Sequence, residues 1–125
     1  MVIDTSVFIE FLRAKDKKST ILYQIVDEDY LSTTSITVFE LLMGATDETK
    51  KQDIKRLTND LIILPFTEQS AVEAGIIFHK LRRNNKLIEF RDIFIAAICI
   101  TNNLPLLTAN RKHFERIEGL SLLDF

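Results

Sequence analysis

The chain has 125 residues, of which 46% are hydrophobic and 27% are charged, and its formal net charge is −2. This length and composition are typical of one globular domain, and the charge excludes a strongly basic nucleic-acid-binding domain. The sequence shows no signal-peptide pattern and no apolar run approaching the ~20 residues of a membrane span. We therefore expect a cytoplasmic protein that does not bind a membrane.

Short apolar runs alternate with stretches of helical spacing along the chain. We expect strands within 1–3, 29–34, 61–66 and 106–107, and a further short strand within 120–125. Apolar residues three and four apart predict helices within 6–12, 19–27, 35–45, 67–85, 92–100 and 111–116. The polar stretch 47–60 is expected to form a surface helix. Strands that alternate with helices indicate an α/β fold with a parallel sheet.

Asp4 directly follows the first apolar run and precedes a helical pattern. Aspartate commonly caps a helix in this place, where the helix dipole also favours it. Thr5 and Ser6 stand beside it, however, and either hydroxyl could form the cap instead. Because sites in open parallel sheets lie at the carboxyl ends of the strands, the Asp4 carboxylate is also a candidate site residue.

Two further acids lie in apolar helical segments. Glu40 is flanked by apolar residues within 35–45, and it could complete a capping box with Thr37 or reach the sheet edge that carries Asp4. Asp92 opens the most apolar helix of the chain, where it could cap that helix or face the middle of the molecule. Buried acids are costly without a partner, which favours a shared role for these residues.

The strand at 106–107 is followed by Thr108 and Asn110, and Asn110 could cap the short helix after it or offer a neutral oxygen ligand. Three carboxylates that converge repel each other, and a divalent cation resolves this repulsion. Oxygen ligands favour Mg²⁺ or Mn²⁺ over Zn²⁺. The two histidines, His79 and His113, do not form a zinc pair, so we expect them at the surface or at the edge of the core.

Cys99 is the single cysteine, which excludes an intrachain disulfide. It lies in the apolar run "IFIAAICI", and no histidine is near it in sequence to activate the thiol. We therefore expect a small buried hydrophobic residue rather than a nucleophile.

Four segments, in this order and at these spacings, resemble the PIN-domain ribonucleases, and in particular the VapC-type toxins of toxin–antitoxin pairs. They are "MVIDTSVFIEFL", "TSITVFELLMGA", "EFRDIFIAA" and "LLTANRKHF". The resemblance covers the whole chain. It implies a single PIN domain at 1–125, with a three-layer α/β/α fold around a short parallel sheet of four or five strands. It further implies a Mg²⁺-dependent endoribonuclease, with Mn²⁺ as an alternative ion, that cleaves RNA and inhibits translation as a type II toxin.

By this resemblance Asp4, Glu40 and Asp92 match the three acids that hold the metal in the family, and they are the expected catalytic residues together with Asn110. Asn110 matches a fourth position that is Asp in many members, so the sequence departs from the four-acid pattern and a second cation would bind more weakly. Ser6 and Thr108 match positions of the family at which a hydroxyl group supports the metal-binding residues. The general base stays open between Glu40 and Asp92, and the number of metal ions is open as well.

Three basic residues adjacent to the candidate site, Arg91, Arg111 and Lys112, are expected to hold RNA phosphates. Glu89 is expected to be a surface acid. The resemblance also implies a homodimer and a small VapB-type antitoxin. We expect the antitoxin to lay a helix on apolar surface supplied by residues of the first two helical segments: Phe8, Phe11, Leu12, Ile21, Leu22 and Ile25.

Other functions remain open at this point. The chain could be a PIN nuclease that processes RNA precursors and is not a toxin. A phosphatase with an aspartate nucleophile is disfavoured, because such enzymes usually place a second Asp where Ser6 stands. A PIN-fold binding module without catalysis is disfavoured by the three intact acids. Cleavage of RNA that stops on addition of a chelator separates the enzyme from the module.

Overall fold

The computed structural model describes all residues from 1 to 125, and strands alternate with helices along the chain. The strands are β1 (Val2–Ile3), β2 (Ser32–Thr34), β3 (Ile62–Leu64) and β4 (Leu106–Leu107). The α-helices are α1 (Thr5–Arg13), α2 (Ile21–Ile25), α3 (Ser35–Met43), α4 (Glu48–Thr58), α5 (Glu68–Arg83), α6 (Phe90–Thr101) and α7 (Arg111–Phe114). A 3₁₀ turn, η1 (Lys17–Ser19), precedes α2. Each expected helix and the first four expected strands are confirmed.

All strand pairs are parallel, and the four-stranded sheet has the order β3-β2-β1-β4. The expected strand within 120–125 does not form: this segment makes only an isolated parallel bridge between Leu106 and Leu122. Its pairing partner β4 has only two residues before the chain turns away at Thr108, so the ladder cannot extend. The sheet therefore has four strands.

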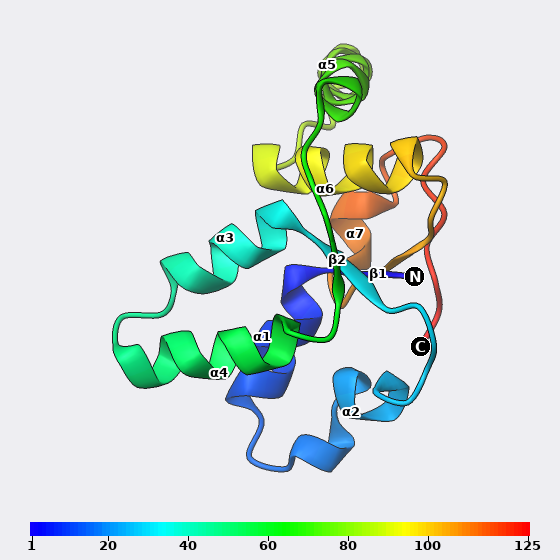
Figure 1. The fold of residues 1–125 in the computed structure, drawn as a ribbon. Helices are drawn as coiled ribbons and strands as arrows, with labels where there is room; N and C mark the ends of the chain where they lie inside the picture. The colour runs from blue at the N-terminus through cyan, green and yellow to red at the C-terminus, as the bar shows by residue number, and fades with distance from the viewer.

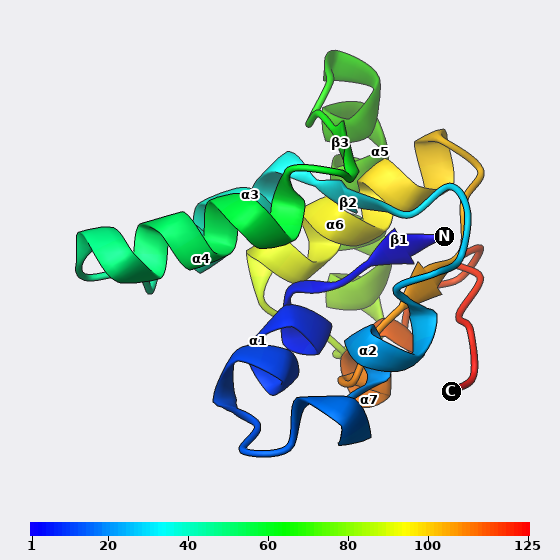
Figure 2. The ribbon, with the colours of Figure 1, turned by 60° about the horizontal axis from the view of Figure 1, so that its bottom comes forward.

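The sheet separates two hydrophobic clusters, because successive side chains of a strand point to opposite faces. Val2 and Leu106 pack with α5, α6 and α7, whereas Ile3 and Leu107 pack with α1, α2 and residues of α3 and α4. Figures 1 and 2 show the sheet between these two groups of helices. This confirms the expected three-layer α/β/α arrangement.

Helix α6 is the central helix of the first cluster, and six of its twelve residues are buried. Cys99 is fully buried within it, as expected for a structural cysteine. Burial raises the pKa of the Cys99 thiol to about 12, so the thiol is neutral and unreactive at physiological pH. No helix of the structure combines the length and the apolar character needed to cross a membrane.

The apolar residues near the first two helices do not form the open surface that the sequence suggested. Phe8, Leu22 and Ile25 are buried in the second cluster, and Phe11 and Ile21 pack partly buried against it. Leu12 is the exception, with 37% of its surface exposed. Half of these residues are therefore part of the core and cover one face of the sheet, and Phe11, Leu12 and Ile21 are the ones that stay partly exposed.

Candidate active site

The candidate site lies where the strand order reverses direction. β1 and β4 are neighbours in the sheet although about a hundred residues separate them in sequence, and Ile3 pairs with Leu107. Asp4 leaves the carboxyl end of β1, and Thr108 leaves the carboxyl end of β4 beside it. In open α/β sheets, such a switch point creates a crevice that commonly holds the ligand.

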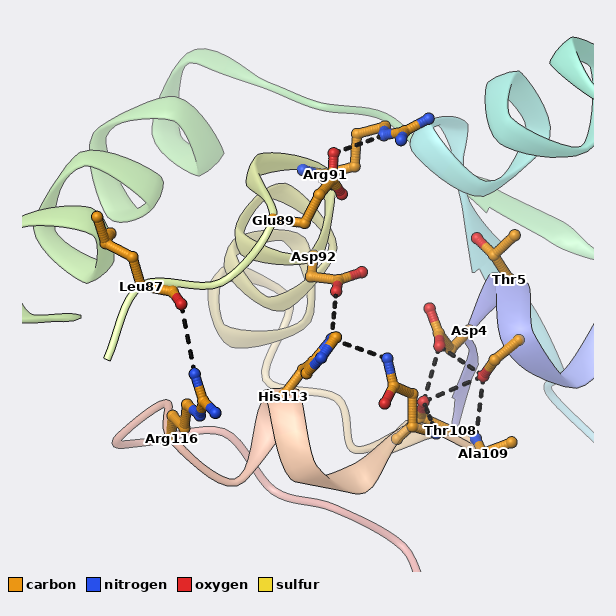
Figure 3. Close-up of polar contacts among 12 residues, drawn as sticks. Asp4, Thr5, Leu87, Glu89, Arg91, Asp92, Thr108, Ala109, His113 and Arg116 are labelled. Atoms are coloured by element: carbon orange, nitrogen blue, oxygen red, sulfur yellow. Dashed lines mark hydrogen bonds and ion pairs between the residues drawn. The ribbon is translucent and has the colours of Figure 1, made fainter. Parts of the chain in front are cut away.

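Asp4 is only 3% exposed and is held by two hydroxyl groups. Ser6 Oγ and Thr108 Oγ1 each donate to Asp4 Oδ2 at 2.7 Å. Both hydroxyls are themselves fixed, because Ala109 N donates to Ser6 Oγ at 3.0 Å and Asn110 N donates to Thr108 Oγ1 at 2.9 Å. Figure 3 shows this network around Asp4. Since Oδ2 accepts both bonds, Oδ1 keeps its capacity for a further partner.

Glu40 reaches the same edge of the sheet from α3. Thr5 Oγ1 lies 3.1 Å from Glu40 Oε1 and 3.0 Å from Thr37 Oγ1, so α1 and α3 are joined at this point. Thr5 follows Asp4 directly in the chain. The Glu40 carboxylate is thereby tied to the residue next to Asp4.

None of the four expected catalytic residues uses its side chain to cap a helix. Asp4 and Asn110 occupy the N-cap positions of α1 and α7, but their side chains make no capping hydrogen bond. The capping box of Thr37 with Glu40 does not form, because Thr34 caps α3 by accepting from Thr37 N at 3.1 Å. Thr5 and Ser6 do not cap α1 either; their hydroxyls bind carboxylates instead.

Asp92 lies in the first turn of α6, and its partner is His113, which the sequence placed at the surface or at the edge of the core rather than in the site. Asp92 Oδ2 lies 3.2 Å from His113 Nδ1, and the same Nδ1 lies 2.8 Å from Asn110 Nδ2. One nitrogen cannot donate to Asp92 and accept from Asn110 in a single tautomer. A proton on Nδ1 satisfies Asp92 and requires Asn110 to turn its amide oxygen toward the ring.

His113 thus joins two of the expected site residues (Figure 3). The sequence offered one signal for it, the spacing of three residues from Asn110, which places both side chains on one side of α7. Its contact with Asp92, 21 residues away, follows from the packing of α7 against α6.

Burial and neighbouring carboxylates disfavour the ionised form of two acids of the site, Asp92 and Glu40. Burial raises the pKa of Asp92, and repulsion from Asp4 adds to this, while the hydrogen bond from His113 opposes it. Burial likewise raises the pKa of Glu40, with Asp4 and Asp92 contributing repulsion and Thr5 and Arg91 opposing it. Mutual repulsion among carboxylates is the condition that a bound cation relieves.

The donor set fits a hard divalent cation. Its members are carboxylate oxygens with one amide nearby, and no thiolate is present, which suits Mg²⁺ or Mn²⁺ rather than Zn²⁺. No three Asp, Glu, His or Cys side chains stand close enough to form a closed metal-binding group. Each acid instead hydrogen-bonds a different neighbour. Asp4 and Glu40 accept from hydroxyl groups, and Asp92 contacts His113.

The basic residues expected to hold RNA differ in their surroundings. Arg91 Nε donates to Glu89 Oε1 at 2.8 Å, and Glu89 also caps α6, so this surface acid orients Arg91. Arg111 is directed to the C-terminal segment, where it donates to Leu123 O at 2.8 Å and pairs with Asp124 at 3.2 Å. Lys112 is exposed and makes no ion pair within the chain.

Known proteins resemble this chain over most of its length. The PIN domain profile matches residues 1–120. Ribonuclease VapC of Rickettsia bellii is 33% identical over 130 residues, which cover 98% of this chain and 94% of the relative. Ribonuclease VapC3 of Methanocaldococcus jannaschii is 43% identical over 97 residues, covering 78% of this chain and 95% of the relative.

A solved structure of VapBC-1 from nontypeable Haemophilus influenzae has the same fold. It superposes with a TM-score of 0.85 at 28% identity, and the match covers 98% of this chain and 96% of that one. Both the sequence match and the fold extend over the elements that carry Asp4, Glu40, Asp92 and Asn110. The chain therefore belongs to the PIN-domain family, within the branch that contains the VapC ribonucleases.

Proposed function

We propose that this protein is a metal-dependent endoribonuclease of the VapC type. It cleaves RNA phosphodiester bonds and inhibits translation as the toxin of a type II toxin–antitoxin pair. The observation that carries the proposal is that one acid follows β1 at a switch point of the sheet, while α3 and α6 bring two further acids toward it. Residues 1–125 would act as one PIN domain.

Asp4, Glu40 and Asp92 would hold the divalent cation, Mg²⁺ or alternatively Mn²⁺. When bound, this ion would lower the pKa of a water molecule and neutralise charge on the scissile phosphate. Asp4 would be the best oriented ligand, because Ser6 and Thr108 fix one of its oxygens. Asn110 would act through His113, which it contacts together with Asp92.

The proton of the attacking water would pass to a carboxylate of the site. Glu40 and Asp92 are both suited to accept it, because burial and repulsion already raise their pKa. Arg91, oriented by Glu89, would contact an RNA phosphate at the mouth of the site, and Lys112 would contact another. Arg111 would bind RNA only if it gave up its contacts with Leu123 and Asp124.

The protein would act in the cytoplasm and would be held inactive by a small VapB-type antitoxin. The support for this partner is that solved relatives of the same fold, such as VapBC-1, are toxin–antitoxin complexes. A homodimer is the proposed form of the toxin. Static light scattering on the purified protein tests this, and a monomer at micromolar concentration would contradict it.

The enzymatic proposal is tested with purified protein and RNA. Cleavage is expected with Mg²⁺, is expected to stop with excess EDTA, and is expected to be abolished in Asp4→Ala and Asp92→Ala. Circular dichroism should show that both variants are folded. Asp27→Ala removes an exposed carboxylate from the segment after α2 and serves as the control with normal cleavage. Full activity of either site variant would contradict the assignment.

The toxin proposal is tested in cells. Expression is expected to arrest growth, whereas Asp4→Ala should not, and co-expression of a VapB-type partner should restore growth. Mapping of RNA 5′ ends after brief expression, with Asp4→Ala as control, identifies the RNA that is cleaved. Cleavage in vitro without growth arrest would favour a nuclease of RNA processing instead.

A further inference from the structure

A polar pocket lies beside the candidate site, between the α5–α6 connection and α7. Its volume is about 390 Å³, and no hydrophobic residue lines it. The lining residues are Asn85, Lys86, Lys112, Glu115 and Arg116. Lys86, which follows α5, therefore meets Lys112 of α7 and Arg116, which follows α7, in one concave surface.

The pocket carries an excess of positive charge. Three of its residues are cationic and one, Glu115, is acidic, and Glu115 already lies 3.6 Å from Arg111 Nε. Lys86 and Lys112 are exposed, and neither ammonium group makes an ion pair or hydrogen bond within the chain. In a chain with net charge −2, such a concentration of unpaired cations favours an anionic ligand.

The frame of the pocket is held by backbone contacts. Arg116 Nη1 donates to Leu87 O at 3.3 Å, which ties the α7 side to the α5–α6 connection. Lys86 N donates to Leu81 O at 2.8 Å, and Asn85 adopts a left-handed conformation with φ of 55°. Lys86 and Arg116 therefore approach from two connected segments of fixed geometry.

The pocket adjoins the acids of the site. Lys112 directly precedes His113, whose Nδ1 contacts Asp92, and the connection that carries Lys86 ends at Glu89, the cap of α6. Figure 3 shows Arg116 and Leu87 beside His113, with Asp4 and Thr108 on the other side of it. An RNA strand whose scissile phosphate lies at the acids would thus bring a neighbouring phosphate to this pocket.

We infer that this pocket binds a backbone phosphate of the RNA strand next to the scissile phosphodiester. The inference rests on the proposed ribonuclease function. Lysine ammonium groups and the arginine guanidinium are the side chains that recognise phosphate oxygens. No aromatic residue lines the pocket, so it offers no stacking platform for a base. The pocket therefore contributes affinity and strand position, and it leaves base selection to other surfaces.

Binding is measured first in the Asp4→Ala background, where RNA is not cut. Kd for a fluorescent single-stranded RNA is determined over a range of salt concentrations. Lys86→Gln with Lys112→Gln is expected to weaken binding about tenfold at low salt. It should also flatten the slope of log K against log salt by about 0.7, since the pocket is inferred to hold one phosphate and each phosphate contact to a single strand contributes about 0.7.

The matched control is Lys15→Gln with Lys18→Gln, which changes the net charge equally. Both lysines are exposed in the connection after α1, at the end of that helix opposite Asp4. Their replacement should leave the slope within about 0.3 of the parent value. Equal changes in the pocket variant and the control would overturn the inference, because they would reflect general charge alone.

Cleavage kinetics provide the second test in the active protein. The pocket variant should raise KM about tenfold with kcat unchanged, and a dinucleotide, which lacks a neighbouring phosphate, should be cleaved equally by variant and parent. A loss of kcat with unchanged KM would overturn the inference. Inorganic phosphate provides a further check. If millimolar phosphate saturates the pocket but does not displace RNA, the inference is also overturned. Absence of Mg²⁺-dependent cleavage in the parent would instead refute the proposed function.

Discussion

At the scale of a single residue, Asp92 shows that the surroundings of the site disfavour an ionised carboxylate. Its side chain is only 17% exposed, and burial together with the nearby Asp4 raises its pKa. Between the ordinary and the raised value, the folded state binds more protons than the unfolded state. The contribution of Asp92 to stability is therefore most favourable at low pH and is lost as pH rises through the folded-state pKa.

The substitution Asp92→Asn should consequently stabilise the protein at pH 7 in the absence of divalent cations. The unfolding temperature is expected to rise by a few degrees, because the neutral amide removes a desolvated charge. The gain should shrink as pH falls through the ordinary aspartate pKa of about 3.9, because the wild-type aspartate then becomes protonated in both states. Thermal unfolding of both proteins across this pH range measures the difference, and a less stable variant at pH 7 would contradict the assignment.

His113 is expected to position Asp92 for metal binding. His113→Ala should weaken Mn²⁺ binding by about tenfold, since removal of residues that orient metal ligands typically costs 10- to 100-fold. His113→Asn keeps a polar side chain at this position and should recover part of the affinity. Isothermal titration with Mn²⁺ measures both effects. His79→Ala, which alters an exposed histidine of α5, should bind like wild type.

At the scale of elements, some helix caps can be predicted from local sequence patterns and others cannot. Thr67 caps α5 by accepting from Ser70 N, and α3 ends at Gly44, as is typical of threonine before a helix and glycine after one. The expected capping roles of Thr37, Thr5 and Ser6 are wrong, because Thr5 binds Thr37 and Glu40 across two helices and Ser6 binds the Asp4 carboxylate. A local pattern identifies residues able to cap a helix, but it does not exclude a stronger partner elsewhere.

Loss of the α3 cap should affect both stability and catalysis. Thr34→Ala removes the acceptor of Thr37 N and is expected to cost about 1 kcal/mol in the free energy of unfolding. It should also reduce cleavage, because α3 carries Glu40. Thr67→Ala removes the comparable cap of α5, which holds no proposed ligand, and should leave cleavage unchanged. Urea unfolding and RNA cleavage assays distinguish the two, and equal activity of both variants would argue against coupling through α3.

At the scale of the whole molecule, the site joins the two layers of helices through the edge of the sheet. Asp4 follows β1, Glu40 lies on α3 and Asp92 lies on α6, so a cation bound to all three would link separate parts of the fold. Such a cation would bind the folded protein preferentially, and the unfolding temperature should depend on its concentration.

Addition of Mn²⁺ should therefore stabilise the wild-type protein. At 100 times the dissociation constant, the expected gain is about 2.7 kcal/mol, and EDTA should reverse it. Asp4→Ala should show little gain, because the residual acids lack the best oriented ligand. Differential scanning calorimetry with and without Mn²⁺ provides the measurement. An equal shift in both proteins would indicate binding at another site.

The sequence by itself determined the alternation of strands and helices, and it placed candidate acids after strands or within apolar helices. These features depend on local periodicity and on the chemistry of single side chains. The PIN-family motifs added the order in which the acids occur. From this information the α/β fold, four of the strands and a converging set of acids could be predicted.

Only the tertiary structure decided which side chains meet. The order β3-β2-β1-β4 brings Thr108 to Asp4 across more than a hundred residues, and the packing of α7 on α6 brings His113 to Asp92. The packing of α7 also brings Lys112 to Lys86 in one pocket. On the other face of the sheet, Phe8 and Ile25 are buried in the second cluster. Such contacts depend on how the helices pack on both faces of the sheet. Local sequence patterns do not determine this packing, because the residues involved are far apart in the chain.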